Sequence, residues 1–469
     1  MTLRLYNSYG RKLIAFRPLV RGQVRMYTCG PTVWNYAHVG NLRTFLFEDL
    51  LRRYLKFTDY KVVQVKNITD VEDKIIKGMK QFGKNLKELT EFYTAAFMED
   101  LTTLRIERAE YYPRATEHIK EILILINRLK EKGLAYQGDD GSIYYDISRF
   151  KRYGKLSGVR VKELKAGARV SQDHYEKGEA HDFALWKRWD EDDGEVFWET
   201  ELGKGRPGWH IECSAMSTKY LGESFDIHTG GKDLRFPHHE NEIAQSEGAT
   251  GKRLAKYWLH AEFLRINGAE MHKSAGNLVT LRQLLEKRWS PRAIRLFLMS
   301  AHYREELNLT DDSLRQAETN ISRIDQTIRR LGMIAGEGGV SQQTKRLTSQ
   351  FLTGFKRAMD NDLGTPKALA AFFTFIRGVN ARVDRGLLST ADSKAIIDAI
   401  SKADAVLGIV ATEDESFPKE LQQLISERDE ARKNRDYKRA DEIREILRKK
   451  GILLQDSPKG TTWSRAHTG

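Results

Sequence analysis

A strand, a helix and a second strand in close succession constrain the fold of this chain more than any other feature. The run Val24–Cys29 is short, apolar and β-branched, as buried strands are. It ends at Gly30 and Pro31, and a helical pattern begins near His38. A second strand candidate, YKVVQVKNITD, follows after Asp59. A strand, a helix and a strand at this spacing predict a βαβ unit, and therefore a parallel sheet.

The remainder of the chain divides into an α/β part and a helical part. A helical pattern covers residues 84–132, and strand character returns at Phe225–Gly231 and Tyr257–Gly268. Between these segments, residues 138–200 lack long periodic stretches and predict an insertion of hairpins and loops. After about Thr280, amphipathic helical windows recur to the end and strand signals nearly vanish.

These patterns predict three domains. The first is an α/β domain with a Rossmann-like parallel sheet at residues 1–280, which contains the insertion at about 138–200. An all-helical stem and bundle follow at 281–410. A linker at Thr412–Pro418 then leads to a small C-terminal domain at 417–469, which contains a charged helical pair.

Composition narrows the class of protein. The 469 residues, 40% of them hydrophobic, suffice for two to four domains with buried cores. No apolar run is long enough to cross a bilayer, and the N-terminus lacks the features of a secretory signal. These features and the presence of only two cysteines predict a soluble cytoplasmic protein. Its charge of +13 suits a polyanionic partner such as RNA, although many soluble proteins are also basic.

One glycine motif does not fit its usual context. GKGRPG (Gly203–Gly208) matches the G-x-G-x-x-G string of dinucleotide-binding proteins. No apolar strand precedes it, Pro207 interrupts it, and no clear helix opening follows. We therefore expect a loop there and no dinucleotide site.

The motif HVGN, from His38 to Asn41, stands at the start of the first predicted helix. Helix N-termini attract phosphate through free N–H groups and the positive end of the dipole. Gly40 permits a close approach of a nucleotide, and His38 could donate hydrogen bonds to phosphate. Taken alone, the motif fits an ordinary helix start that a histidine caps better than it fits a phosphate site.

A second motif, EMHKSAGN (Glu270–Asn277), lies in a loop after a predicted strand. Lys273 and Ser274 in such a loop could close over a triphosphate. A solvated turn with one lysine is the alternative.

Four residues form a candidate metal set. The two cysteines are Cys29 and Cys213, and PHHENE places His238 and Glu242 four residues apart, on one face of a helix. Thiolate, imidazole and carboxylate donors together suit Zn²⁺. Buried free cysteines and a surface His–Glu pair are the alternative.

Several longer strings carry a resemblance to a known family. CGPTVWNYAHVGNLRTF, KNITDVEDKII, GRPGWHIECSAMS, DIHTGGKDLRFPHHENEIAQSE and DSPKGTTWSR together resemble the cysteinyl-tRNA synthetases, which are class I aminoacyl-tRNA synthetases. The resemblance runs from about Leu5 to Arg465. HVGN and EMHKS stand where that class carries its two signature motifs, with Asn41, Glu270 and His272 as departures from the usual residues.

The resemblance implies roles for individual residues. It implies that one zinc ion per chain is bound at Cys29, Cys213, His238 and Glu242, and that His38, Asn41 and Lys273 are catalytic. It places Thr69 and Trp209 in a cysteine pocket. The implied ATP-binding residues are Thr32, His38, Gly40, Asn41, Gly230, Gly231, Asp233, Lys273 and Ser274. In the C-terminal domain it implies anticodon contacts at Arg432, Asp441, Asp456 and Trp463.

The resemblance also implies a reaction and its partners. A protein of this family activates L-cysteine with ATP and Mg²⁺ and transfers it to the 3′ end of tRNA(Cys). Residues 1–280 would then be the catalytic domain and 417–469 the anticodon-binding domain. We expect a monomer without a membrane partner. A cysteine ligase that uses a small amine acceptor and an inactive RNA-binding paralogue are the alternative functions.

Overall fold

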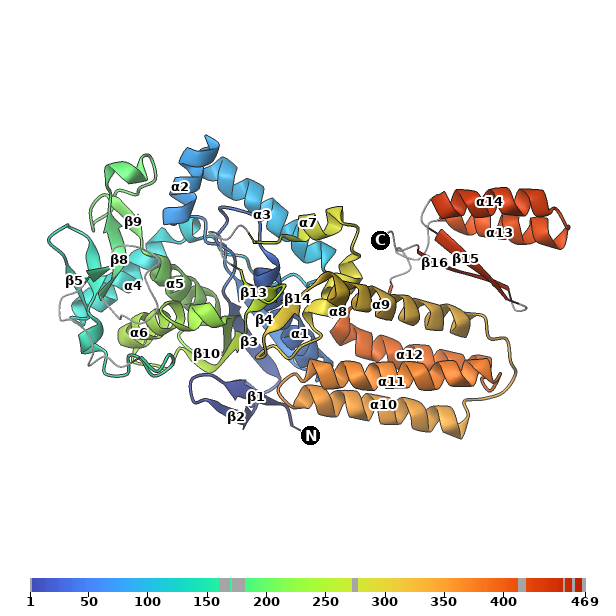
Figure 1. The fold of residues 1–469 in the computed structure, drawn as a ribbon. Coiled ribbons are helices and arrows are strands. Elements are labelled where there is room, and N and C mark those ends of the chain that lie inside the picture. The colour runs from blue at the N-terminus through green and yellow to red at the C-terminus, as the bar shows by residue number, and fades with distance from the viewer. Residues whose placement is uncertain are drawn as a thin grey trace.

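The computed structural model (Figure 1) describes residues 2–159, 169–170, 182–271, 277–411, 419–449, 452–457 and 460–465. Lys273 and Ser274, two of the predicted ATP-binding residues, lie outside these ranges. No helix in the described ranges is long and apolar enough to cross a membrane.

A four-stranded parallel sheet forms the centre of the N-terminal domain. Its order is β11 (Ala255–Ala261), β10 (Phe225–Gly231), β3 (Gln23–Thr28) and β4 (Lys61–Lys66). Helix α1 (Val39–Phe57) connects β3 to β4. The predicted βαβ unit and the Rossmann-like fold class are therefore confirmed. The strand order reverses between β3 and β10, and ligands of open α/β sheets bind in the crevice at such a point.

Helices cover both faces of this sheet, which explains why most residues of its strands are buried, whichever face they point to. Successive side chains of a strand point to opposite faces. Met26 packs in the core that includes α1, whereas its neighbour Tyr27 packs in a second core. That second core includes α4 (Ile119–Glu131) and α5 (Trp209–Leu221).

The segment that precedes α4 differs from the predicted continuous helix. Helices α2 (Asp73–Phe82) and α3 (Leu86–Thr103) are separated from α4 by an extended stretch that runs beside β4. The N–H groups of Lys66 and Ile68 donate to the carbonyls of Tyr111 and Pro113 in this stretch. Pro113 cannot continue a helix without losing a hydrogen bond, which favours the extended backbone.

The predicted insertion forms a small sheet of its own. The sheet contains β5 (Ala135–Gln137), β6 (Ile143–Tyr145), β7 (Arg169–Val170), β8 (Asp182–Arg188) and β9 (Gly205–Pro207). Strand β9 lies inside GKGRPG, which we predicted to be a loop, and pairs antiparallel with β8. A side chain at Gly205 would collide with the Lys187 carbonyl, so close strand packing accounts for this glycine.

The helical half begins with α7 (Leu281–Glu286) and α8 (Pro291–Leu298). Helices α9 (Asp311–Gly332), α10 (Gln342–Asp360), α11 (Thr365–Asp384) and α12 (Thr390–Leu407) then lie side by side (Figure 1). Short strands flank the sheet and the stem: β1 (Arg4–Asn7), β2 (Lys12–Ala15), β12 (Leu264–Ile266), β13 (Ala269–Glu270) and β14 (Leu307–Leu309).

The C-terminal unit extends away from the bundle in Figure 1. It contains the predicted helical pair, α13 (Lys419–Lys433) and α14 (Tyr437–Lys449). It also contains an antiparallel hairpin, β15 (Ile452–Ser457) and β16 (Gly460–Arg465), which the all-helical prediction for this half missed.

Candidate active site and metal centre

The four predicted metal ligands meet at the carboxyl ends of the central strands. Cys29 directly follows β3, and Cys213 lies in α5. His238 and Glu242 lie in α6 (His238–Thr250), one helical turn apart. All four are buried, and one ligand atom from each lies within 4.8 Å of the others. Three elements that are distant in sequence therefore bring two sulfur, one nitrogen and one oxygen donor together.

Glu242 is the common point of this cluster. Its Oε1 lies 3.1 Å from Nε2 of His238 and 3.8 Å from the Cys29 sulfur. The other ring nitrogen of His238, Nδ1, lies 2.9 Å from Nδ1 of His210. Histidines that bind a metal through one nitrogen commonly form a hydrogen bond through the other, and His238 has that arrangement.

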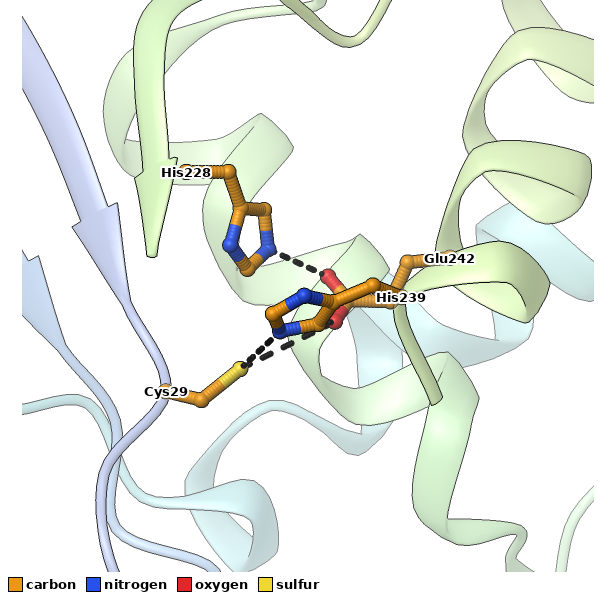
Figure 2. Close-up of side chains that lie close together, drawn as sticks. All are labelled: Cys29, His228, His239 and Glu242. Atoms are coloured by element: carbon orange, nitrogen blue, oxygen red, sulfur yellow. Dashed lines mark hydrogen bonds and ion pairs between the residues drawn. The ribbon is translucent and has the colours of Figure 1, made fainter. Parts of the chain in front are cut away.

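A second set of donors shares Cys29 and Glu242 and adds His228 and His239 (Figure 2). Nε2 of His239 lies 3.4 Å from the Cys29 sulfur, and Nε2 of His228 lies 2.9 Å from Oε2 of Glu242. Nδ1 of His239 faces Nε2 of His260 at 2.8 Å. The geometry alone therefore offers two overlapping metal sets.

Sequence analysis missed most of the histidines at this centre. His210, His228, His239 and His260 surround the predicted ligand His238, and all five are buried. The available signal was their density, because five of the twelve histidines fall within residues 210–260. Burial lowers the pKa of His239 well below its usual range, and neighbouring histidines add to the effect. Burial likewise lowers the pKa of His260, to about 3. Both rings are therefore neutral at pH 7 and offer a lone pair.

The chemistry of the donors fits a divalent cation. Burial raises the pKa of Cys29 well above its usual range, and the adjacent Cys213 and Glu242 raise it further. Buried acidic groups that raise one another's pKa lack compensating positive charge, which a metal dication supplies. Sulfur, nitrogen and oxygen donors together suit zinc in particular.

Trp209 contacts the cluster directly, whereas Thr69 pairs with the segment that follows Cys29. The Trp209 ring stacks on the ring of His238, with centroids 4.3 Å apart and planes at 30°. Thr69 is buried and accepts a hydrogen bond from Asn67 through its hydroxyl. The backbone of Thr69 pairs with Thr32, a predicted ATP-binding residue. One residue predicted for the cysteine pocket is therefore paired with one predicted for the nucleotide site.

The HVGN motif begins α1, as predicted, and His38 is its N-cap. Nδ1 of His38 accepts from the N–H of Asn41 at 3.3 Å, and the Asn41 side chain accepts from the N–H of His38 at 3.2 Å. Burial lowers the pKa of His38, an effect that Asp233 opposes. Because Nδ1 accepts, the single proton of the neutral ring lies on Nε2, where it can be donated to a ligand.

The two signature motifs touch each other. A methyl group added to Gly40 would collide with the side chain of Met271, which belongs to the EMHKSAGN motif. His38 and Thr280 also form an antiparallel bridge. Packing between the motifs is thus one reason for glycine at position 40.

The glycines at the end of β10 have an internal explanation. A side chain at Gly230 would collide with the ring of His239, and one at Gly231 would collide with Asp233. Asp233 itself is exposed, in the short 3₁₀ helix that follows β10. Because Gly230 has no side chain, the ring of His239 fits beside it, next to the Cys–His–Glu cluster.

The predicted anticodon residues lie in the C-terminal unit, where a salt bridge joins two of them. The Arg432 guanidinium lies 2.6 Å from the Asp456 carboxylate. Asp456 is also bound by both terminal nitrogens of Arg428, which is buried and which sequence analysis missed. Asp441 is exposed on α14, and Trp463 lies in β16 opposite Leu454.

Comparisons with known proteins cover nearly the whole chain. Three family models match it: "tRNA synthetases class I (C) catalytic domain" at residues 15–319, "DALR domain" at 354–411, and "Cysteinyl-tRNA ligase anticodon binding domain" at 414–463. The cysteine–tRNA ligase of Chlamydia pneumoniae is 45% identical over 98% of this chain and 97% of its own length. The cysteine–tRNA ligase of Thermococcus onnurineus is 42% identical over 99% of each chain. The solved Mycobacterium tuberculosis methionyl-tRNA synthetase in complex with methionyl-adenylate shares the fold, with a TM-score of 0.61 at 15% identity, over 82% of this chain and 90% of that one.

Proposed function

Because the chain belongs to the cysteine–tRNA ligase family, we propose that its buried Cys–His–Glu cluster holds the metal by which it recognises cysteine. The protein charges tRNA(Cys) with L-cysteine. The observation that carries the metal proposal is the convergence of Cys29, Cys213, His238 and Glu242 within 4.8 Å at the reversal point of the sheet.

The reaction has two steps that need no protein nucleophile. The carboxylate of cysteine attacks the α-phosphate of ATP, which releases pyrophosphate and leaves cysteinyl-adenylate. A hydroxyl of the terminal adenosine of the tRNA then attacks the carbonyl carbon, and AMP leaves. Catalysis is therefore positioning and charge stabilisation.

The chain's own residues supply the phosphate contacts in this proposal. His38 donates its Nε2 proton to a phosphate oxygen, while Asn41 fixes the ring from the other side. Lys273 adds positive charge from the second motif, and Mg²⁺ accompanies ATP. The activation chemistry belongs to residues 1–280 and the reading of the anticodon to residues 417–469.

Recognition of cysteine requires discrimination against serine, which differs only by oxygen in place of sulfur. Ordinary pocket contacts separate such near-isosteres by modest factors. Zinc bound at this cluster would favour a thiolate ligand over a hydroxyl, which is harder and much less acidic. Trp209 covers His238 and forms the wall of the pocket on that side.

Of the two overlapping donor sets, we propose that the zinc ligands are Cys29, Cys213, His238 and Glu242. Two thiolates give this set the softer donors, which zinc prefers to a third nitrogen or oxygen. His228 and His239 then orient Glu242 and Cys29 from outside the ligand shell, as hydrogen-bonded neighbours do around zinc.

Cobalt substitution distinguishes the two sets without reference to activity. Co²⁺ bound to thiolates absorbs in the near ultraviolet, and the intensity rises with the number of sulfur ligands. We expect the native chain to absorb with the intensity of a site that has two thiolate ligands. Cys213→Ser, which keeps only Cys29, should absorb about half as strongly. An unchanged intensity in Cys213→Ser would assign the metal to the set with His228 and His239.

The two alternative functions are not supported. A match to the cysteinyl-tRNA ligase anticodon binding domain at residues 414–463 opposes a ligase whose acceptor is a small amine. Relatives named cysteine–tRNA ligase match over nearly the full chain, which opposes an inactive RNA-binding paralogue. We further expect a monomer in the cytoplasm, where translation takes place. Light scattering after size exclusion tests the monomeric state.

A further inference from the structure

Four aromatic side chains form a cluster beside the HVGN motif. We call Tyr36, Phe82, Phe92 and Tyr93 the aromatic ledge. The Tyr93 ring centroid lies 5.3 Å from Tyr36, 5.1 Å from Phe92 and 6.5 Å from Phe82. Tyr36 and Phe92 also meet edge to face, at 6.1 Å. Tyr93 is buried and packs against the other three rings.

Two rings of the aromatic ledge are unusually open to solvent. Phe82 is 42% exposed and Phe92 is 46% exposed. Every other phenylalanine in the described part of the chain is buried or half-buried. Apolar side chains that gather on a surface are typical of sites that bind a partner, whereas single ones need no explanation, and Phe82 and Phe92 both pack on Tyr93.

Two cations lie over rings of the aromatic ledge, and further basic residues lie near it in the sequence. Residues 74–87 contain five lysines and no acidic residue, although Lys80 pairs with Asp192 and Lys87 pairs with Glu91. The ammonium group of Lys84 lies 4.6 Å from the centroid of Phe92. The guanidinium of Arg282 lies 4.6 Å from the centroid of Tyr36, although Glu99 and Asp100 pair with it. Aromatic rings interleaved with cations are the surface that single-stranded nucleic acids bind.

The aromatic ledge adjoins the catalytic motifs directly. Tyr36 precedes His38 by two residues, and Arg282 follows Thr280 by two residues. His38 and Thr280 are themselves paired by a backbone bridge. In Figure 1, the helices that carry the ledge, α2 and α3, lie along the upper edge with α7, and the C-terminal unit extends at the upper right.

We propose that the aromatic ledge binds the unpaired 3′ end of the tRNA by base stacking and guides its terminal adenosine toward His38. This inference rests on the proposed function. A chain that charges tRNA has to bring the 3′ end of that tRNA to the site beside His38. Phe82 and Phe92 provide faces for bases, and Lys84 contacts the phosphate between them. Stacking on a ring does not depend on base identity, which suits an end that is common to all tRNAs.

Substitutions at Phe92 test the proposal through affinity for two forms of tRNA(Cys). One form is complete, and the other lacks the unpaired 3′ nucleotides. Phe92→Leu keeps an apolar side chain and removes the π face, whereas Phe92→Trp keeps the face. Ile124→Ala, at a position on α4 that is 47% exposed, is the matched control for loss of a surface apolar group.

We expect Phe92→Leu to bind complete tRNA about tenfold more weakly than the native chain and truncated tRNA equally well. Phe92→Trp and Ile124→Ala should bind both forms as the native chain does. Equal binding of complete tRNA by Phe92→Leu and the native chain would overturn the proposal, and so would an equal loss for both forms. Charging of tRNA(Cys) by the native chain is measured in parallel. If it is absent, the proposed function fails; if it is present, only the ledge is in question.

Discussion

Glu242 is the side chain that both donor sets of the candidate metal site share, together with Cys29. It is fully buried, and its two oxygens reach His228 and His238 on different elements. A carboxylate in such a place is costly unless positive charge or several donors surround it. The surrounding histidines satisfy its oxygens, and a zinc ion would supply the charge.

We predict that Glu242→Gln lowers the affinity for zinc by about 100-fold or more, because the substitution removes one ligand charge at the centre. Competition with a chromophoric chelator measures this affinity. Glu240→Gln is the matched control, since Glu240 is equally buried on α6 but accepts from the N–H groups of Gly154 and Ser157, away from the cluster. Equal zinc affinity in Glu242→Gln and the native chain would exclude Glu242 as a ligand.

At the residue scale, the sequence predicts four donor residues that the structure brings together, but not the residues that surround them. Two cysteines in the chain and a His–Glu pair four residues apart are conspicuous, and a family resemblance joined them. Nothing in the sequence indicates that His228, inside β10, points to Glu242 in α6. The sequence also does not show why positions 40 and 230 are glycines. Each makes room for a side chain from another segment, Met271 at Gly40 and His239 at Gly230.

Among the secondary-structure elements, α12 shows how one carboxylate fixes a helix start. Asp392 accepts hydrogen bonds from the N–H groups of Ser389, the N-cap of α12, and of Ser341, the N-cap of α10. Burial alone would raise the pKa of Asp392, but these hydrogen bonds outweigh it and lower the pKa from 3.8 to about 2. The ionised form therefore ties two helices of the bundle together.

The lowered pKa predicts how stability depends on pH. The folded state holds the Asp392 proton more weakly than the unfolded state, so this group stabilises the fold above pH 3.8. The contribution is lost as the pH falls from 3.8 toward 2. We expect Asp392→Asn to reduce the free energy of unfolding at pH 7 by about 1–2 kcal/mol. Urea unfolding at pH 7 and pH 3 checks this, and an equal loss at both values would contradict it.

Helices and strands were predicted correctly where the period of the hydrophobic pattern and the length of the segment indicated the same kind of element. The strand–helix–strand pattern at the N-terminus and the amphipathic helices of the bundle both meet that condition. The prediction failed at residues 105–114, where the backbone runs beside β4 because of hydrogen bonds to that strand rather than because of a local pattern. It also missed the β15–β16 hairpin, whose strands are short and whose Leu454 packs against Ile443 and Leu447 of α14.

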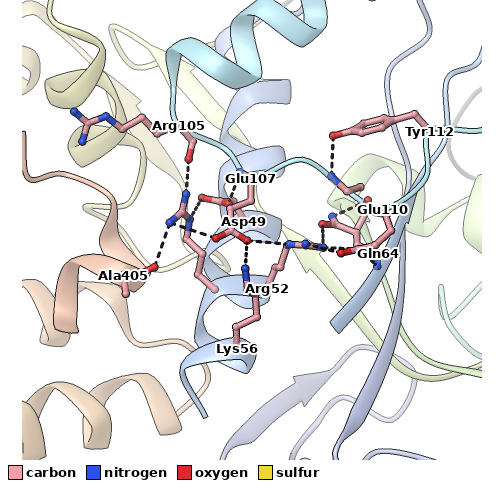
Figure 3. A network of polar contacts seen from close by, with 12 residues as sticks. Asp49, Arg52, Lys56, Gln64, Arg105, Glu107, Glu110, Tyr112 and Ala405 are labelled. Carbon is pink, nitrogen blue, oxygen red and sulfur yellow. Dashed lines mark hydrogen bonds and ion pairs between the residues drawn. The ribbon is translucent and has the colours of Figure 1, made fainter. Parts of the chain in front are cut away.

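For the whole molecule, buried arginines join the α/β domain to the helical bundle. Arg295 of α8 is fully buried and donates to the carboxylate of Asp49 in α1 and to the carbonyl of Leu407 at the end of α12. Figure 3 shows the adjoining polar network, in which Asp49 of α1 and Ala405 of α12 lie close together. Arg53 connects those two residues directly.

We predict that Arg295→Met destabilises the protein by about 3 kcal/mol, because it leaves buried carbonyls without donors and removes one of the two arginines that pair with Asp49. Arg315→Met is the control, since Arg315 forms an exposed pair with Asp312, and its removal should leave the stability close to that of the native chain. The two variants are compared by the urea concentration at which half of the protein is unfolded. Equal midpoints would show that the buried contacts contribute no more than the surface pair.

The function of the whole molecule rests on one claim, that a metal held by Cys29, Cys213, His238 and Glu242 selects cysteine. The most direct measurement is amino-acid-dependent exchange of pyrophosphate into ATP, with cysteine and serine in parallel, before and after removal of the metal by a chelator. We predict exchange with cysteine but not with serine, loss of that exchange when the metal is removed, and recovery when Zn²⁺ is restored. Exchange with cysteine that persists in protein verified to be free of metal would contradict the claim, as would equal exchange with serine.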